Sequence, residues 1–251
     1  PLPNGTRHIT FNCRIPPFNN KKIREAVCYA IDAEELFQAS VWGVGEQANQ
    51  LIWSKTTKWH NPNIKPREKN LDKARKLLEE AGHGKGLTVQ AIASASYPGI
   101  FLQPVQIVQA NLRDIGITVE VETLDWATYW RKWITTHEYQ LITPSFATVA
   151  DPDDWYWGQF HSSADSSSYS GFHTPELDKL LEEGRDIVDE NRRVEIYQKI
   201  AQILHDESIA VPHTIPLHIN GMWENINGYS GDSVGNMYWQ DGKGLPRTWI
   251  A

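Results

Sequence analysis

The fold is decided by residues 71–143, which read LDKARKLLEEAGHGKGLTVQAIASASYPGIFLQPVQIVQANLRDIGITVEVETLDWATYWRKWITTHEYQLIT. Apolar residues in this stretch switch between helical spacing and strict alternation. Gly82 stands where the first helix should end, and Asp125 stands where the third should begin. Strands alternating with helices of this length predict an α/β lobe whose mixed, mainly parallel sheet is flanked by helices. We expect helices at 71–81, 102–115 and 126–136 and strands at 87–93, 118–123 and 139–143.

The segments on either side of this stretch predict further elements. Asn19 or Asn20 can cap a helix that runs to residue 31, and Asp32 with Glu35 has the spacing of a capping box at the start of the next helix. Residues 41–66 contain glycines and prolines without a period and predict a long loop. Residues from 220 onward have no helical period and are expected to pack on something else. The remaining elements are a strand at 8–13, helices at 155–160, 176–188 and 190–206, and strands at 209–213 and 217–219.

Composition excludes several classes of function. The net charge is −7, and no block of lysine and arginine exceeds three residues, so we expect no nucleic-acid partner. No apolar run approaches the roughly 18 residues of a membrane span. The opening residues, Pro1 to Gly5, resemble neither a signal peptide nor a native start, so we expect a piece of a longer protein. Cys13 and Cys28 are expected to be buried free thiols.

Two short motifs suggest hydrolysis, but their contexts do not fit. Ser233 lies in a G-x-S-x-G motif, yet no helical pattern or histidine follows it. Asp151 and Asp153 are too close along the chain to face each other across a glycosidic bond, so we expect Asp153 or Asp154 to cap the helix at 155–160. A hydrolase that uses Ser233, or Asp151 and Asp153, is the alternative from a different class, but the favoured interpretation is that the chain is not an enzyme. No metal is expected, since no histidine pair has the i, i+4 spacing of a zinc site, and no cofactor is expected either.

Aromatic residues are unusually frequent, with eleven tryptophans in the chain. Trp126, Trp130 and Trp133 share one face of an expected helix, which predicts a place in the core. Aromatic residues in loops are better candidates for contacting an apolar or sugar-like ligand in a cleft. These loop residues are Trp42, Trp53, Trp59, Tyr97, Phe101, Phe146, Trp155 and Trp157.

The order of several motifs resembles the family 5 extracellular solute-binding proteins, the receptors for peptides, nickel and oligosaccharides. The resemblance covers about residues 6 to 230. Its first part is the segment that opens the second lobe in that family. The matching motifs are Phe11-Asn12-Cys13 with Pro16-Pro17-Phe18-Asn19, Ile23-Arg24-Glu25-Ala26-Val27, Tyr29-Ala30-Ile31-Asp32, Leu71-Asp72-Lys73-Ala74, Ile115-Gly116-Ile117, Asp125-Trp126 with Tyr129, Asp151-Pro152-Asp153 and Tyr169-Ser170-Gly171.

This resemblance implies a lobe of a type II periplasmic-binding-protein fold. Residues 13–218 would form the second of two lobes around a ligand cleft, after a crossover segment at 1–12. Residues 219–251 would be a tail that returns to the missing first lobe. The implied function is the substrate-binding component of an ABC importer, whose partners are a small-molecule ligand, the membrane permease and the first lobe. The intact protein would be periplasmic or extracellular, or tethered outside the membrane by a lipid.

The resemblance also implies that the ligand lies against loops 94–101 and 144–149. In peptide-binding members an aspartate holds the α-amino group, and in dipeptide binders an arginine holds the carboxylate; this chain has Thr148 and Ala95 at those positions. Without these charges a neutral ligand such as an oligosaccharide is favoured over a peptide. An oligopeptide or dipeptide receptor is the alternative. The expected ligand-binding residues carry hydroxyls or aromatic rings: Ser94, Tyr97, Phe101, Ser145, Phe146 and Thr148.

Overall fold

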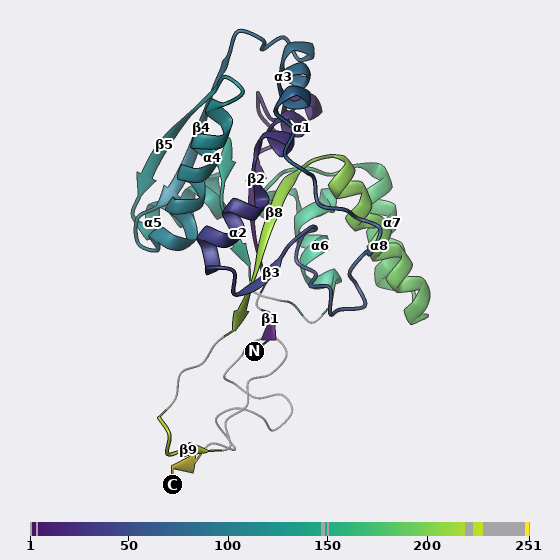
Figure 1. Cartoon of the computed structure of the whole chain (residues 1–251). Helices are drawn as coiled ribbons and strands as arrows, with labels where there is room; N and C mark the ends of the chain where they lie inside the picture. The colour runs from purple at the N-terminus through teal and green to yellow at the C-terminus, as the bar shows by residue number, and fades with distance from the viewer. Residues whose placement is uncertain are drawn as a thin grey trace.

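A computed structural model of the chain describes residues 2–3, 5–146, 149, 151–218, 223–227 and 249–250, and a mixed sheet lies at its centre (Figure 1). The strand order is β1-β8-β2-β6-β4-β5, with β3 also paired to β8 and β7 to β2. A separate short ladder joins β9 (Ile226–Asn227) and β10 (Trp249–Ile250). The strands of the main sheet are β1 (Leu2–Pro3), β2 (Thr6–Phe11), β3 (Gly45–Gln47), β4 (Leu87–Ser94), β5 (Ile117–Leu124), β6 (Leu141–Ile142), β7 (Ser145–Phe146) and β8 (Ala210–His218).

The predicted α/β class with a mixed sheet is confirmed, but parallel pairing is confined to one side of the sheet. β4 runs parallel to β5 and to β6, because a helical crossover follows β4 and another follows β5. The expectation of a mainly parallel sheet is wrong for the other side. There β2 pairs antiparallel with β6, β7 and β8, and β8 pairs antiparallel with β1 and β3. β7 follows closely after β6, and β8 follows closely after α8, so on this side the order of the strands along the chain differs from their order in the sheet.

The helices begin close to the predicted positions, because their capping side chains are readable in the sequence. Asn20 accepts a hydrogen bond from the backbone N–H of Lys22, and Asp32 accepts one from Glu35 at 3.0 Å. The α-helices are α1 (Lys21–Ala30), α2 (Ala33–Val41), α3 (Leu71–Glu80), α4 (Gln103–Arg113), α5 (Trp126–Trp130), α6 (Asp153–Phe160), α7 (Pro175–Asp186) and α8 (Glu190–Asp206). Two π-helical turns, Pro98–Leu102 and Arg131–Thr136, adjoin α4 and α5, and a 3-10 segment spans Ser162–Ser167. No helix in the described part of the chain is long and apolar enough to cross a membrane.

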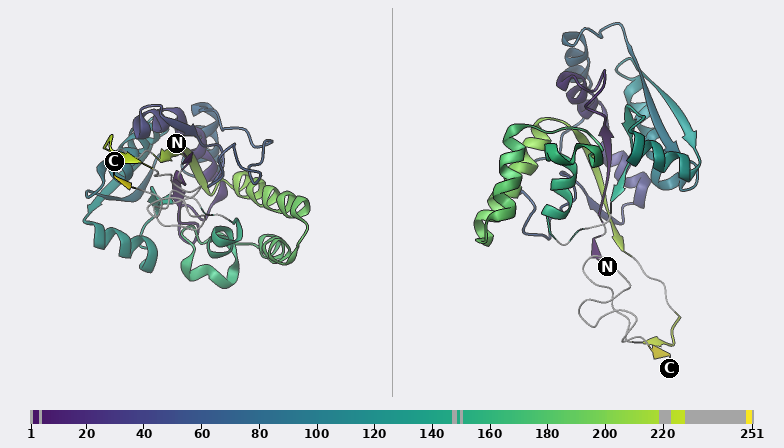
Figure 2. Two further views of the ribbon diagram at one scale, coloured as in Figure 1. Left: turned by 90° about the horizontal axis from the view of Figure 1, so that it is seen from below. Right: turned by 180° about the vertical axis from the view of Figure 1, so that it is seen from behind.

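Three hydrophobic clusters hold these elements together. The first joins α1, α3 and α4 to β2, β4 and β5, and the third packs α5 and its π-helical extension against the other face of β4 and β6. The second lies among α6, α7 and α8. Figure 2 (right) shows the green helices α6–α8 on one side of β2 and β8, with β4, β5 and α5 on the other. Strands β2 and β8 therefore lie between two bodies, one built on the first and third clusters and the other on the second cluster.

The segment at 41–66 differs from the predicted long loop. It contains β3, and its side chains Trp53 and Trp59 are only 2% and 7% exposed within the second cluster. Ile64 is also buried. Its buried tryptophans pack against helices that are distant in the sequence. Their positions therefore follow no helical or strand period that a sequence pattern could show.

The two cysteines are free thiols, as predicted. Cys28 is buried in the first cluster, and Cys13 is half-buried. Burial raises the pKa of each thiol to about 11. At neutral pH both thiols are therefore protonated.

Candidate functional site

The parallel strands β4, β5 and β6 end at one edge of the sheet. In open α/β sheets, ligands bind beyond the carboxyl ends of the strands, where the connecting loops converge. Both predicted ligand loops start at this edge: Ser94 is the last residue of β4, and Ser145 follows shortly after β6. Asp125 starts α5 at the end of β5, where its carboxylate accepts a hydrogen bond from the backbone N–H of Thr128 at 3.1 Å.

Hydrogen bonds join the loop at 94–101 and helix α5 to Thr143, the residue before the second predicted ligand loop. The hydroxyl of Thr143 donates to the backbone oxygen of Phe101 at 2.9 Å. The hydroxyl of Tyr129, on α5, donates to the backbone oxygen of Thr143 at 3.2 Å. All three residues are buried, so these bonds are shielded from water. The segments that follow β4, β5 and β6 are thus fixed to one another.

The six predicted ligand residues differ in how the structure presents them. Tyr97 is 51% exposed, and Ser145 is half-buried in β7. Ser94 and Phe101 are buried: the Ser94 hydroxyl accepts from the backbone N–H of Ser96, and Phe101 lies in the third cluster. Phe146 is the second residue of β7, and Thr148 lies outside the described residues. In the described part, Tyr97 and Ser145 are the members that a ligand can reach without rearrangement.

Two tryptophans extend the aromatic surface beside Tyr97. The ring of Trp126 lies 5.2 Å from that of Tyr97 at an interplanar angle of 84°, and 5.5 Å from that of Trp130. Trp130 is 46% exposed, so its predicted place in the core is wrong, whereas Trp133 is 2% exposed, as expected. The cap at Asp125 could have predicted that Trp126 lies at this edge. The cap directly follows β5, so the first residue of the helix lies at the carboxyl end of that strand.

The remaining loop aromatics divide into buried and exposed residues. Trp155 is 7% exposed and belongs to the second cluster together with Trp53 and Trp59. Trp42 is 88% exposed in the turn after α2. Trp157 lies against the guanidinium of Arg185, whose central carbon is 3.4 Å from the ring centroid. Most of these residues therefore serve packing rather than ligand contact.

The aspartates at 151 and 153 form ion pairs with two arginines. Asp151 also accepts a hydrogen bond from the backbone N–H of Asp153, the first residue of α6, at 2.9 Å. Arg193 donates from both terminal nitrogens to the Asp151 carboxylate, at 2.6 and 2.7 Å, and Arg185 donates to Asp153 at 2.7 and 3.0 Å. The cap position is held by Pro152 without a side-chain bond, so the predicted capping is wrong. Hydrogen bonds from Arg193 lower the pKa of Asp151. A carboxyl with a lowered pKa is a poor general acid, and Ser233 lies outside the described residues.

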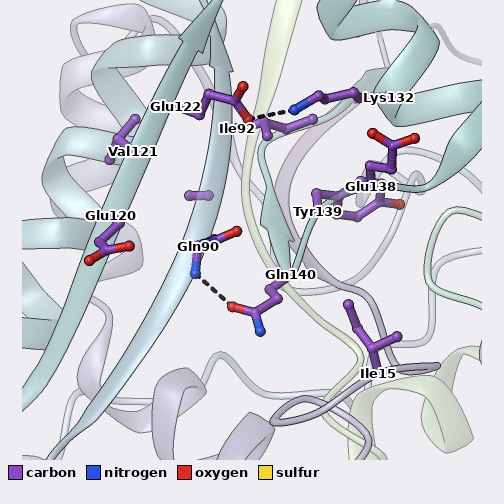
Figure 3. A pocket seen from close by; sticks show the side chains of 11 residues that line it. Ile15, Gln90, Ile92, Glu120, Val121, Glu122, Lys132, Glu138, Tyr139 and Gln140 are labelled. Carbon is purple, nitrogen blue, oxygen red and sulfur yellow. Dashed lines mark hydrogen bonds and ion pairs between the residues drawn. The ribbon is translucent and has the colours of Figure 1, made fainter.

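A cavity of about 570 Å³ lies along the middle of β4 and β5 and the start of β6 (Figure 3). Its wall includes the pair Glu122 and Lys132, at 2.6 Å, and the side-chain oxygen of Gln140, which accepts from the backbone N–H of Gln90 at 2.7 Å. It contains none of the six predicted ligand residues. Among the described residues, no group of three or more histidine, cysteine, aspartate or glutamate side chains could hold a metal ion.

Comparison with known proteins identifies a family. Residues 1–168 match the model for bacterial extracellular solute-binding proteins, family 5 Middle. The chain is 24% identical over 241 residues to the dipeptide-binding protein of Escherichia coli, and 26% identical over 234 residues to heme-binding protein A of Haemophilus influenzae. These alignments cover 93% and 88% of this chain but 44% and 41% of the relatives, so the chain spans less than half of their length.

A solved structure shows the same fold. The oligopeptide-binding protein AppA from Bacillus subtilis, in complex with a nonapeptide, superposes with a TM-score of 0.85 at 22% sequence identity. The match covers 100% of this chain and 51% of that one. The architecture described above is therefore the architecture of about half of a binding protein of this type.

Proposed function

The chain belongs to the bacterial extracellular solute-binding proteins of family 5, and we propose that it is the second, ligand-binding lobe of a receptor for an ABC importer. The observation that carries this proposal is the carboxyl edge of β4, β5 and β6, where a hydrogen bond joins the loop at 94–101 to Thr143, shortly before β7. In the proposed organisation residues 13–218 form the lobe, residues 1–12 are the crossover from the first lobe, and residues 219–251 return to it.

The ligand we propose is a short peptide. The relatives named above are proteins described as binding a dipeptide, haem and a nonapeptide, and none of these names supports the sequence-based preference for an oligosaccharide. That preference depended on the absence of charge at Ala95 and Thr148. Absence of charge in two loops does not exclude a peptide when other parts of the cleft can hold its ends.

The proposed contacts are the accessible side chains at the carboxyl edge. Tyr97 and Trp126 supply aromatic faces, and Ser145 supplies a hydroxyl. Thr148 and Phe146, on the loop that begins at β7, remain proposed ligand residues. Ser94 and Phe101 would act by holding that edge in place, because both are buried.

A binding function is favoured over hydrolysis. The carboxylates of Asp151 and Asp153 are each engaged by an arginine, and the relatives are binding proteins rather than enzymes. The proposed partners are the peptide, the first lobe and the membrane permease of the importer. The proposed location is outside the cytoplasmic membrane, in line with the family's extracellular description.

Isothermal titration of the full-length protein with a set of short peptides and with neutral oligosaccharides tests the proposal. Tyr97→Ala and Trp126→Ala should each weaken peptide binding by about tenfold, as expected for the loss of a ring with 1–2 kcal/mol of contact energy. Tyr29→Ala is the matched control, since that ring lies on α1 beside Lys73 of α3, far from the edge. Binding that is unchanged in both edge variants, or weakened equally in the control, would place the ligand elsewhere.

A further inference from the structure

Arg7 lies beside a predicted ligand residue, on the crossing strand β2. It pairs with Ser145 of β7 on one side and with Thr214 of β8 on the other. Residues directly opposite each other in an antiparallel pair project from the same face of the sheet with Cβ atoms about 5 Å apart. The side chains of Arg7 and Ser145 are therefore neighbours on one face. Because β6 lies between β2 and β4, Arg7 is two strand spacings, or about 10 Å, from the strand that carries the Tyr97 loop.

The charge of Arg7 is unmatched within the part of the chain that the structure describes. One terminal nitrogen donates to the backbone oxygen of Ser40, in the last turn of α2, at 3.0 Å. The buried Nε has no acceptor, and no carboxylate of the described residues forms an ion pair with the guanidinium. Burial lowers the pKa of Arg7, and no nearby negative charge opposes this effect.

Two further polar atoms near Arg7 are buried without a hydrogen-bond partner in the described part of the chain. They are the hydroxyl of Ser40 and Nε2 of His213. His213 is fully buried, and burial together with the charges of His8 and Arg7 keeps its pKa well below the usual range, so the imidazole is neutral. The helix carbonyl at Ser40 contributes only a partial negative charge. A largely buried cation without a full counter-charge is costly, and a bound anion would remove that cost.

We propose that Arg7 binds a carboxylate of the ligand, next to the hydroxyl of Ser145. This inference rests on the proposed function and deepens it, because it assigns a free acid group to the ligand, such as the C-terminus of a peptide. Guanidinium binds carboxylate through paired, charge-assisted hydrogen bonds. Arg7 then supplies, from the strand, the positive charge that is missing from the loop at Ala95.

Nuclear magnetic resonance tests the anion site without requiring knowledge of the ligand. In the ¹⁵N-labelled chain, the Nε–H signal of Arg7 is assigned by its disappearance in Arg7→Lys. Acetate should shift this signal saturably, whereas neutral acetamide should not. Arg113, exposed at the end of α4, is the control for weak surface contact. No saturable shift at Arg7, or an equal shift at Arg113, would overturn the inference.

Peptide titrations of the full-length protein then distinguish the sources of the carboxylate. The wild type should bind trialanine at least tenfold more tightly than trialanine amide, and Arg7→Met should bind both at the level of the amide. Affinity for the amide that is equal in wild type and variant shows that the fold is intact. A preference for the acid that persists in Arg7→Met overturns the inference.

If the partner of Arg7 is a carboxylate of the protein itself and not of the ligand, the titrations give a different result. The wild type would then bind acid and amide equally, and Arg7→Met would lower the melting temperature without any ligand; this also overturns the assignment to the ligand. If the wild type binds neither peptide while Arg7 still responds to acetate, the proposed peptide function fails and the anion site stands.

Discussion

Replacing Arg24 with methionine should destabilise the protein, because this side chain joins the first helix to the end of the last one. Arg24 is 3% exposed in α1. Its Nη1 donates to the backbone oxygen of Phe18 at 2.9 Å. Its Nε and Nη2 donate to the backbone oxygen of Glu207, just after α8, at 3.2 and 2.9 Å. The guanidinium also lies over the ring of Phe172 at 5.7 Å.

The size of the effect follows from these contacts. Methionine retains most of the apolar stem but leaves the carbonyls of Phe18 and Glu207 without their charged donor. Hydrogen bonds to charged groups contribute about 1.5–3 kcal/mol each, which gives roughly 3–6 kcal/mol for two acceptors. Removing a buried guanidinium also removes its desolvation cost, which offsets part of this loss. We expect the free energy of unfolding to fall by about 2–4 kcal/mol.

Urea denaturation at neutral pH measures this change through the transition midpoint, provided that the slope is unchanged. For a chain of this size the melting temperature should fall by roughly 4–16 °C. Lys22→Met is the matched control, since Lys22 lies on the same helix and pairs with Glu80 at the exposed surface. The control should stay within about 0.5 kcal/mol of the wild type. An Arg24→Met variant as stable as this control would refute the idea that the side chain joins the two bodies.

Three further predictions concern acidity, backbone conformation and thiol reactivity. Burial lowers the pKa of His8 from 6.5 to about 3, so the unfolded state binds more protons below pH 6.5. Stability should therefore be lost as pH falls from 6.5 toward 3, by about 1.4 kcal/mol per pH unit for this residue, and His8→Gln should flatten that slope in urea titrations. Gly171→Ala should lower stability by about 1–3 kcal/mol, since φ is 61° and a Cβ would clash with the Arg14 side chain. Cys28, with a pKa of about 11, should resist a thiol-specific disulfide reagent in the native chain and react fully in denaturant.

Each of these predictions has an outcome that contradicts it. A wild-type slope that His8→Gln leaves unchanged would mean that other groups cause the loss at low pH. Gly99→Ala is the control for Gly171→Ala, because nothing lies within 4 Å of the added carbon, and equal effects would remove the argument from strain. Rapid modification of Cys28 in the native chain would show that the first cluster opens readily around α1.

Features with a local physical cause could be predicted from the sequence. In a helix cap, a side-chain oxygen accepts a hydrogen bond from a backbone N–H two or three residues further along. The cap residues Asn20, Asp32 and Asp125 therefore located the starts of three helices. In the parallel strands β4 and β5, apolar residues alternate with polar ones or follow one another, and both strands were predicted within one residue at each end. In both cases the information lies within a few positions of the residue concerned.

Features with a distant cause could not be predicted in this way. Trp53 and Trp59 are buried by α6, α7 and α8, which lie about a hundred residues or more further along the chain. Asp153 or Asp154 was expected to cap its own helix, but Arg185 of α7 binds Asp153, and Arg193 of α8 binds Asp151. An ion pair between segments leaves no periodic pattern in either segment, and cap propensity is too weak to compete with a bidentate guanidinium.

The same reasoning applies to the ligand class, for which the comparisons do not support the predicted oligosaccharide. The sequence-based preference for a neutral ligand came from counting charges in the loops at 94–101 and 144–149, and those loops are indeed uncharged. The strand β2 also borders this edge, and backbone pairing places its residue Arg7 opposite Ser145. In an alternating strand a single arginine resembles a solvent-facing residue, so its burial and missing partner became visible only in three dimensions. The charge that a ligand meets at this edge has to be summed over every strand and loop that reaches the edge. The attraction between an anion and a cation depends on the distance between them and not on the type of element that carries the cation.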